Sequence, residues 1–186
     1  MSSPLITWGI HVTSDDYIIV GVLEPGDPYT PTDKSTRALL IFGMDGKQQH
    51  TYQYDSNKHR LFTLPRRITT NNNKDIVVVD RTSDVTGRVG GSLRWMYTGH
   101  SQINVTTQFN PFDVVTTTTE HIIVCDISTH ALHVLSGQGD ILTCKVMEDT
   151  GIKYPVSLDI DMRGQLWVGC YTSKQSGAKI HKLNIV

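Results

Sequence analysis

The chain is poor in cysteine and in long apolar runs, and each shortage excludes a class of protein. Only three of its 186 residues are cysteine, and a small odd number argues against a framework of disulfide bonds. No apolar run approaches the length of a membrane span, and residues 1–7 lack the basic and apolar parts of a signal peptide. We therefore expect a cytoplasmic protein with no membrane partner.

Excess charge and catalytic motifs are lacking as well. With 17 Lys and Arg against 18 Asp and Glu, the formal net charge is −1, which excludes a general polyanion-binding protein but allows a local basic patch. No Lys-Ser/Thr pair follows Gly87, Gly90 and Gly91, so they do not form a phosphate-binding loop. There is also no Gly-x-Ser-x-Gly. We expect no catalytic residue and no cofactor.

What the chain does contain is an internal repeat. Pro65, Pro111 and Pro155 are 46 and 44 residues apart, and Thr7 begins a fourth copy with the same internal offsets. In each copy, an apolar residue lies three residues after the start, and an apolar stretch begins eleven residues after the start. The four apolar residues are Ile10, Ile68, Val114 and Leu158, and the stretches begin at Ile18, Ile76, Ile122 and Leu166. This spacing is the first guide to the fold.

Each copy is expected to contain four short strands. The apolar stretches are rich in Val, Ile and Thr and flank polar turns, which is typical of strands. A second strand pair follows, as in residues 38–42 and 48–52 around the turn at Met44–Lys47. We predict an all-β fold, a β-propeller of four-stranded antiparallel blades, with about four blades, an incomplete ring and no helix. The repeats cover approximately residues 5–54, 60–104, 106–150 and 152–186.

The segment from Asn110 to Leu135 resembles an NHL repeat, the propeller unit found at the C-terminus of tripartite-motif ubiquitin ligases. The repeat reads approximately Pro, Ile, a turn, Ile-x-Val-x-Asp and then Asn-x-Arg-Ile-x-Val, and residues 124–126 and 132–134 are in register with it. The resemblance covers nearly the whole chain. It implies a non-catalytic recognition platform for a protein or single-stranded RNA, one that selects targets for ubiquitination or RNA repression. The zinc-binding clusters and coiled coil of such ligases are missing from this sequence.

Three departures from the repeat predict irregular blades. Residues 24–36 form an insertion in the first copy, and the second copy leaves room for only Arg88-Val89 as its third strand. We expect that blade to be stunted, with Leu93–Tyr97 poorly paired. Residues 178–186 are expected to be an outer strand with an unpaired edge, and the first copy to lack a neighbour on one face. Such edges and faces favour self-association.

Four residues near the third copy attract attention as metal ligands: His121, Cys125, His130 and His133. His121 and Cys125 are four apart on one expected strand, which separates them by about 13 Å. They therefore cannot share one zinc ion. A buried thiol and histidines on strand surfaces are expected instead.

An enzymatic alternative rests on Asp159 and Asp161, which share one face of an expected strand. In propeller hydrolases of the lactonase type, carboxylates on the innermost strands hold a metal ion in the central channel. The equivalent pairs here are poor in carboxylates: His11 and Thr13, Thr69 and Asn71, Val115 and Thr117. Asp161 is also suited to start a turn. A metal-dependent, lactonase-like hydrolase is the alternative function.

A cluster of basic residues around the second copy is the candidate ligand site. Its members are Lys58, His59, Arg60, Arg66, Arg67, Arg81 and Arg88. In a four-stranded blade, the loop entering the first strand and the loop after the second strand share one face. The cluster is therefore expected to bind phosphate groups or an acidic peptide, unless it is a solvated face balanced by Asp55, Asp80 and Asp84.

Overall fold

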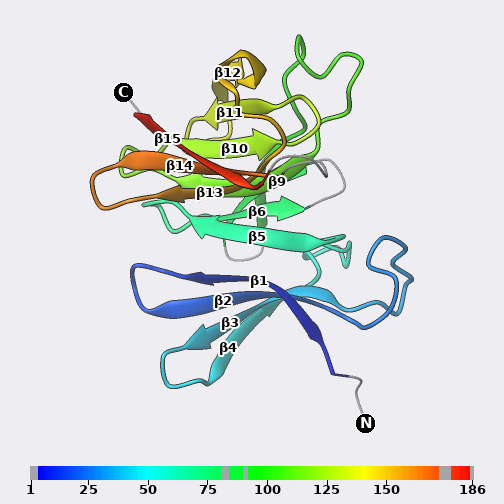
Figure 1. Cartoon of the computed structure of the whole chain (residues 1–186). Coiled ribbons are helices and arrows are strands. Elements are labelled where there is room, and N and C mark those ends of the chain that lie inside the picture. Colours follow the sequence, from blue (N-terminus) through cyan, green and yellow to red (C-terminus); the bar gives the residue numbers. More distant parts are fainter. Residues whose placement is uncertain (1–3, 81–83, 90–91, 172–176, 185–186) are drawn as a thin grey trace.

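Fifteen strands in four antiparallel sheets make up nearly all the regular structure in the described part of the chain (Figure 1). The computed structural model describes residues 4–80, 84–89, 92–171 and 177–184, and for residues 84, 88 and 89 it describes the backbone alone. Each sheet is a meander in which consecutive strands are neighbours. The sheets follow one another along the chain as blades of a β-propeller, which we number 1 to 4.

The strands are short, and each blade lies within one of the four repeats. Blade 1 contains β1 (Ile6–Val12), β2 (Tyr17–Leu23), β3 (Arg37–Gly43) and β4 (Gln48–Tyr52). Blade 2 contains β5 (Pro65–Thr70), β6 (Ile76–Asp80), β7 (Asp84–Val89) and β8 (Ser92–Tyr97). Blade 3 contains β9 (Pro111–Thr116), β10 (Ile122–Asp126), β11 (Ala131–Leu135) and β12 (Ile141–Val146). Blade 4 contains β13 (Pro155–Ile160), β14 (Gln165–Cys170) and β15 (Lys179–Asn184).

The innermost strands β1, β5, β9 and β13 connect neighbouring blades. β1 contacts β5, β5 contacts β9, and β9 contacts β13, whereas β13 and β1 share no comparable contact. Figure 1 shows the same order, with β5 between β1 and the strands of blades 3 and 4. The second strands β6 and β10 are buried at every position, because their blades have a neighbour on both faces. This explains why the sequence is most continuously apolar there.

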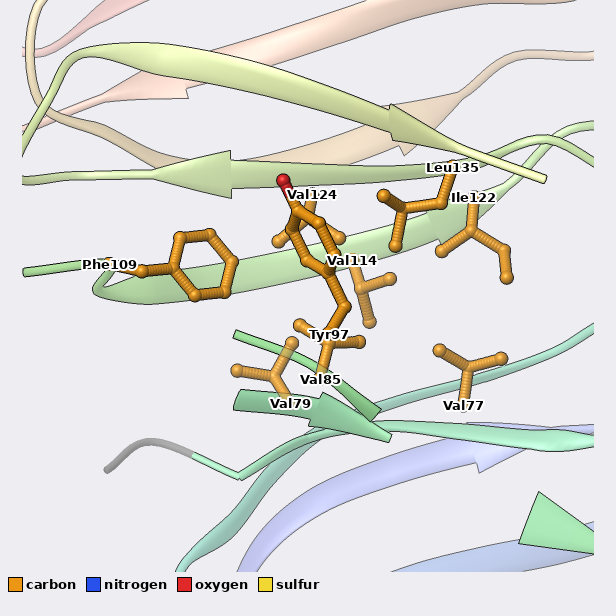
Figure 2. Packing of buried hydrophobic residues seen from close by; sticks show 9 residues of the cluster. All are labelled: Val77, Val79, Val85, Tyr97, Phe109, Val114, Ile122, Val124 and Leu135. Carbon is orange, nitrogen blue, oxygen red and sulfur yellow. The ribbon is translucent and has the colours of Figure 1, made fainter. Parts of the chain in front are cut away.

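The core is divided into three clusters, one in each seam between neighbouring blades. Ile19, Leu39 and Ile41 face Ile68, Ile76 and Val78 in the first seam. In the second seam, Val77 and Val79 of β6 face residues of blade 3 across the gap, with Tyr97 and Phe109 alongside (Figure 2). The third seam contains a cluster from β10 and β11 packed against Leu158, Leu166 and Val168. Burial of apolar surface between successive blades therefore stabilises the fold.

The outer face of blade 1 lacks such a neighbour, as the sequence predicted. Ile10 is 66% exposed, whereas its repeat equivalents Ile68, Val114 and Leu158 are buried against a preceding blade. Val12, on the same face of β1, is also exposed. The predicted outer strand of the last repeat is confirmed too: β15 pairs with β14, and within the described residues no fourth strand pairs with it.

Two predictions about the secondary structure are wrong. The second blade is not stunted, because β7 begins at Asp84 rather than Arg88 and pairs along its length with both β6 and β8. The connection after β6 is short, so the third strand lies upstream of the position where the spacing placed it. The expectation of no helix fails at Glu148–Thr150, a single 3-10 turn after β12. No helix in the described residues is long and apolar enough to cross a membrane.

Candidate functional site: a groove at the centre of the blades

The innermost strands of all four blades line one groove with a volume of about 410 Å³. We call it the central groove, and its lining residues are Ile10, His11, Arg67, Ile68, Thr69, Asp113, Val114, Val115, Thr116, Leu158, Asp159 and Ile160. The position two residues after each repeat start contributes Arg67 and Asp113, and the position four residues after it contributes His11, Thr69, Val115 and Asp159. Equivalent positions of the repeat thus bring polar side chains of separate blades together in the central groove.

An ion pair spans the groove at the end where the innermost strands begin. The Arg67 Nε lies 3.5 Å from Asp113 Oδ1. The other carboxylate oxygen of Asp113 accepts a hydrogen bond from the Leu158 backbone N–H at 2.9 Å. Asp113 therefore joins its own blade both to the arginine of blade 2 and to the backbone of blade 4.

The protein environment shifts the pKa values of two groove residues. Burial raises the pKa of Asp113, although backbone N–H groups and the charges of Arg67 and Arg66 oppose this. Burial lowers the pKa of His11, which favours its neutral imidazole. The His11 Nε2 is 2.9 Å from Thr70 Oγ1 at the opposite end of the groove. One end therefore holds the Arg67–Asp113 ion pair, and the other holds His11 and Thr70 together with the Asp159 carboxylate.

Arg67 is the predicted basic residue best placed to meet a ligand. Its side chain is 41% exposed and lines the groove. The buried Nε makes no hydrogen bond to another described residue, so Asp113 attracts the guanidinium without satisfying this donor. A guanidinium with free donors binds carboxylate or phosphate oxygens well. Arg66 lies beside it, stacked on Phe112 of β9 at 3.6 Å from the ring centroid.

The other predicted basic residues do not converge on this place. Arg60 donates to the backbone carbonyls of Thr32 and Ser35, both at 2.7 Å, and so anchors the insertion of blade 1. Lys58 and His59 are exposed in a turn, where His59 contacts Asp55 at 3.2 Å. Lys58, His59 and Arg60 therefore lie apart from Arg67 and do not form one binding site with it.

The prediction that Arg88 shares a face with Arg60 and Arg67 is wrong. Arg88 pairs with Ile76 at the beginning of β6, whereas the loop that precedes β5 lies beside the end of β6. There the Asp80 carboxylate accepts hydrogen bonds from the backbone N–H groups of Thr63 and Leu64. The backbone of Arg88 therefore lies at the opposite end of the blade. Arg81 lies outside the described residues.

The residues considered as metal ligands have other contacts. Cys125 is fully buried, as expected. His133 is buried on β11, not exposed, and its Nδ1 lies 2.8 Å from the Tyr97 hydroxyl. His121 follows a threonine turn, and His130 packs edge-on against Tyr154. Among the described residues, no group of three or more His, Cys, Asp and Glu side chains is arranged to hold a metal ion.

Asp159 and Asp161 also separate in the structure. Asp159 lines the central groove. Asp161 begins the turn before β14 and accepts hydrogen bonds from the backbone N–H groups of Arg163 and Gln165 and from the Trp167 indole. The turn role expected for Asp161 is therefore confirmed, and the pair does not form a carboxylate site.

Comparison with known proteins identifies the fold. No family model and no curated protein matches the chain. Among solved structures, a protein of unknown function from Bacteroides caccae is 15% identical with a TM-score of 0.64, over 90% of this chain and 58% of that one. A catalytically inactive variant of virginiamycin B lyase from Staphylococcus aureus with quinupristin is 14% identical with a TM-score of 0.58, over 100% of this chain and 72% of that one. A luciferin-regenerating enzyme is 13% identical with a TM-score of 0.61, over 93% and 59%.

These likenesses establish the class of the protein, a β-propeller built of repeated blades. At such low identity they show the fold alone. The chain spans little more than half the length of the Bacteroides protein and of the luciferin-regenerating enzyme.

Proposed function

We propose that the chain is a non-catalytic recognition module that binds an anionic group of a protein or single-stranded RNA in its central groove. The observation that carries the proposal is Arg67, a half-exposed guanidinium in a groove to which all four blades contribute. Propellers present such positions on a rigid scaffold, and ligand sites are commonly concave with a few convergent polar groups. The resemblance to NHL repeats supports a role in target selection.

Asp113 supports recognition rather than acid–base chemistry. Its oxygens accept hydrogen bonds from the backbone N–H groups of Val114 and Leu158, so neither oxygen is directed only toward a substrate. The carboxylate instead lies beside Arg67, whose half-exposed side chain lines the groove. Carboxylates and phosphates both fit these donors, which leaves the source of the anionic group to experiment.

A titration with three probes tests the proposal: inorganic phosphate, an eight-residue acidic peptide and an eight-residue oligouridine. We expect Arg67→Ala to weaken binding of the preferred probe about tenfold, the usual loss for a charge-assisted hydrogen bond. The matched control is Lys47→Ala, which removes an exposed lysine from the turn between β3 and β4. Equal affinity of wild type and Arg67→Ala for every probe contradicts the proposal. Oligouridine binding that falls steeply with salt identifies an RNA partner.

The alternative is a metal-dependent, lactonase-like hydrolase, and two observations favour keeping it in view. His11, whose pKa is lowered by burial, lines the groove together with Asp159, and the solved structures of similar fold include enzymes. Calcium or zinc retained stoichiometrically after dialysis, together with lactone hydrolysis that His11→Ala abolishes, would establish this alternative and displace the recognition proposal.

A further inference from the structure

A pocket separate from the central groove lies in the first seam, between blades 1 and 2. We call it the seam pocket. Its volume is about 120 Å³, and its walls include Tyr17, Ile19, Ile41, Tyr52 and Ile76. The turns after β1 and β5 form its rim, where the Lys74 Nζ lies 2.7 Å from Asp15 Oδ2. The pocket thus has apolar walls and a polar, nearly neutral rim.

Strand register identifies the equivalent place in the second seam. In blade 1, Leu39 pairs with Tyr52 and Ile41 with His50. In blade 2, Val85 pairs with Tyr97 and Gly87 with Trp95. Tyr97 is therefore the counterpart of Tyr52, and Trp95 is the counterpart of His50.

In the second seam, the chain's own Trp95 fills this place. A Cβ atom added at Gly87 would lie 2.2 Å from the indole, and one added at Gly139 of blade 3 would lie 2.4 Å from it. Trp95 also packs against the buried cluster between the two blades. Beside it, Arg94 Nη1 contacts the buried Asp75 carboxylate at 2.9 Å. Two glycines thus make room for an indole that closes the seam.

The first seam lacks this filling. The residue at the indole position is His50, which is exposed and stacked on Tyr52 with ring centroids 6.1 Å apart. Ile41 stands where blade 2 has Gly87. A hollow therefore remains between Tyr52 and the turn before Ile76.

We propose that the seam pocket binds an aromatic side chain, tryptophan or tyrosine, of a partner protein. The partner's ring enters the hollow beside Ile41 and Tyr52 and closes the first seam, as Trp95 closes the second. The volume suits one ring, since an apolar cavity of about 150 Å³ takes up benzene. The walls offer ring and aliphatic contacts, which favour aromatic rings beyond the area they bury.

The charges at the rim favour a protein partner over a nucleic acid. Lys74 is the cation among the lining residues, and Asp15 neutralises it. Asp16 adds a further carboxylate in the same turn. A site for nucleic acid is expected to carry excess positive charge for the phosphates, and this rim carries none.

Adding small probes to the isotope-labelled full chain while recording its amide signals by NMR tests the proposal. We expect N-acetyl-tryptophanamide to shift the amide signals of Tyr17, Ile41 and Tyr52, saturating at millimolar concentrations. N-acetyl-leucinamide, the matched apolar probe, is expected to bind about fivefold more weakly because it lacks the ring contacts. Adenosine monophosphate is the third probe. No saturable shifts with the tryptophan probe, or tighter binding of the nucleotide, would overturn the proposal.

Two variants of one strand sharpen the test. His50→Trp places an indole beside Ile41 at the mouth of the pocket and is expected to block the pocket and abolish binding. Thr51→Trp, the control, places the same indole on the other face of β4, because Thr51 pairs with Leu40, and is expected to bind like wild type. Unchanged binding by a folded His50→Trp contradicts the proposal. Wild-type crystals soaked with N-acetyl-tryptophanamide give a check that needs no variant: density for the probe in the seam pocket supports it, and an empty pocket refutes it.

Discussion

The first and second seams of this propeller have the same plan and differ in how they are filled. Both pack the central strands of one blade against the first two strands of the next. The second seam is completed by Trp95, with Tyr97 bonded to the buried His133, whereas the first leaves a pocket beside Tyr52. The repeat therefore fixes the blade packing, while a few residues of the third and fourth strands decide whether a seam is filled or leaves a pocket.

The equivalent tyrosines give the largest expected difference between the seams. Tyr97 is buried and its hydroxyl contacts His133, so Tyr97→Ala is expected to cost about 4 kcal/mol of unfolding free energy. Tyr52 is half-buried beside the pocket, and Tyr52→Ala is expected to cost only about 1 kcal/mol. Urea unfolding measures both, and equal losses would break the comparison.

Removal of Trp95 should open the second seam. Trp95→Ala leaves a hollow over Gly87 and Gly139 and is expected to cost about 3 kcal/mol. Leu93→Ala, on the same strand but half exposed, is the control and should change stability by less than about 0.5 kcal/mol. A similar loss in both variants would show that the indole does not close the seam.

The acid stability of the second seam depends on Asp126, which lies 3.7 Å from His133 Nε2. Burial opposes its ionisation, but the nearby His133 ring and the hydrogen bonds donated by Thr129, Asn104 and the Ser128 backbone N–H prevail and lower its pKa to about 2. Since the folded pKa lies below the ordinary value near 3.8, the stabilisation is complete above about pH 4 and is lost as the pH falls to about 2.

Replacing this carboxylate should remove the acid dependence. We expect Asp126→Asn to cost about 2 kcal/mol at pH 7 and to flatten the decline in stability between pH 4 and pH 2. The control is Asp45→Asn in the exposed turn of blade 1, for which the wild-type decline should remain. Unfolding curves across this pH range measure both, and an unchanged slope for Asp126→Asn would refute the assignment.

The smallest expected difference concerns the ion pairs beside each seam. Arg94→Ala leaves the buried Asp75 with fewer partners and is expected to cost about 1–2 kcal/mol. Lys74→Ala breaks an exposed pair with Asp15 and should lower stability less than Arg94→Ala does, because solvent and salt screen exposed charges. Thermal unfolding at low and high salt distinguishes the two. A larger loss of stability for Lys74→Ala than for Arg94→Ala would contradict the expectation that the ion pair beside the second seam contributes more.

The fold was predictable because apolar residues recur at the same spacing in all four copies. Ile68, Val114 and Leu158 occupy one structural position, and their common offset predicted the four sheets. The start of β7 was not predictable from this spacing, because Asp84 and Thr86 are polar and interrupt the apolar pattern typical of a strand. Its pairing with β6 is a tertiary contact that overrides local propensity.

The site was harder to predict, because neighbours in sequence separate in a blade. Lys58, Arg60 and Arg67 are close along the chain, yet Arg60 binds the carbonyls of the insertion and Arg67 turns into the central groove. The inner-strand positions of the repeat do predict the groove, but by their basic and acidic residues together rather than by carboxylates alone. Aligning the repeats two residues after each start places Arg67 beside Asp113, and the contact between the blades supplies the rest.

The most direct test of the equivalence between the seams is to turn the closed seam into an open one. Indole should raise the unfolding temperature of Trp95→Ala by several degrees, because it refills the space over Gly87 and Gly139. Amide shifts should then appear at Val85 and Gly87 in the variant and stay absent there in wild type. If indole neither stabilises the variant nor shifts these signals, the two seams are not equivalent and the account is contradicted.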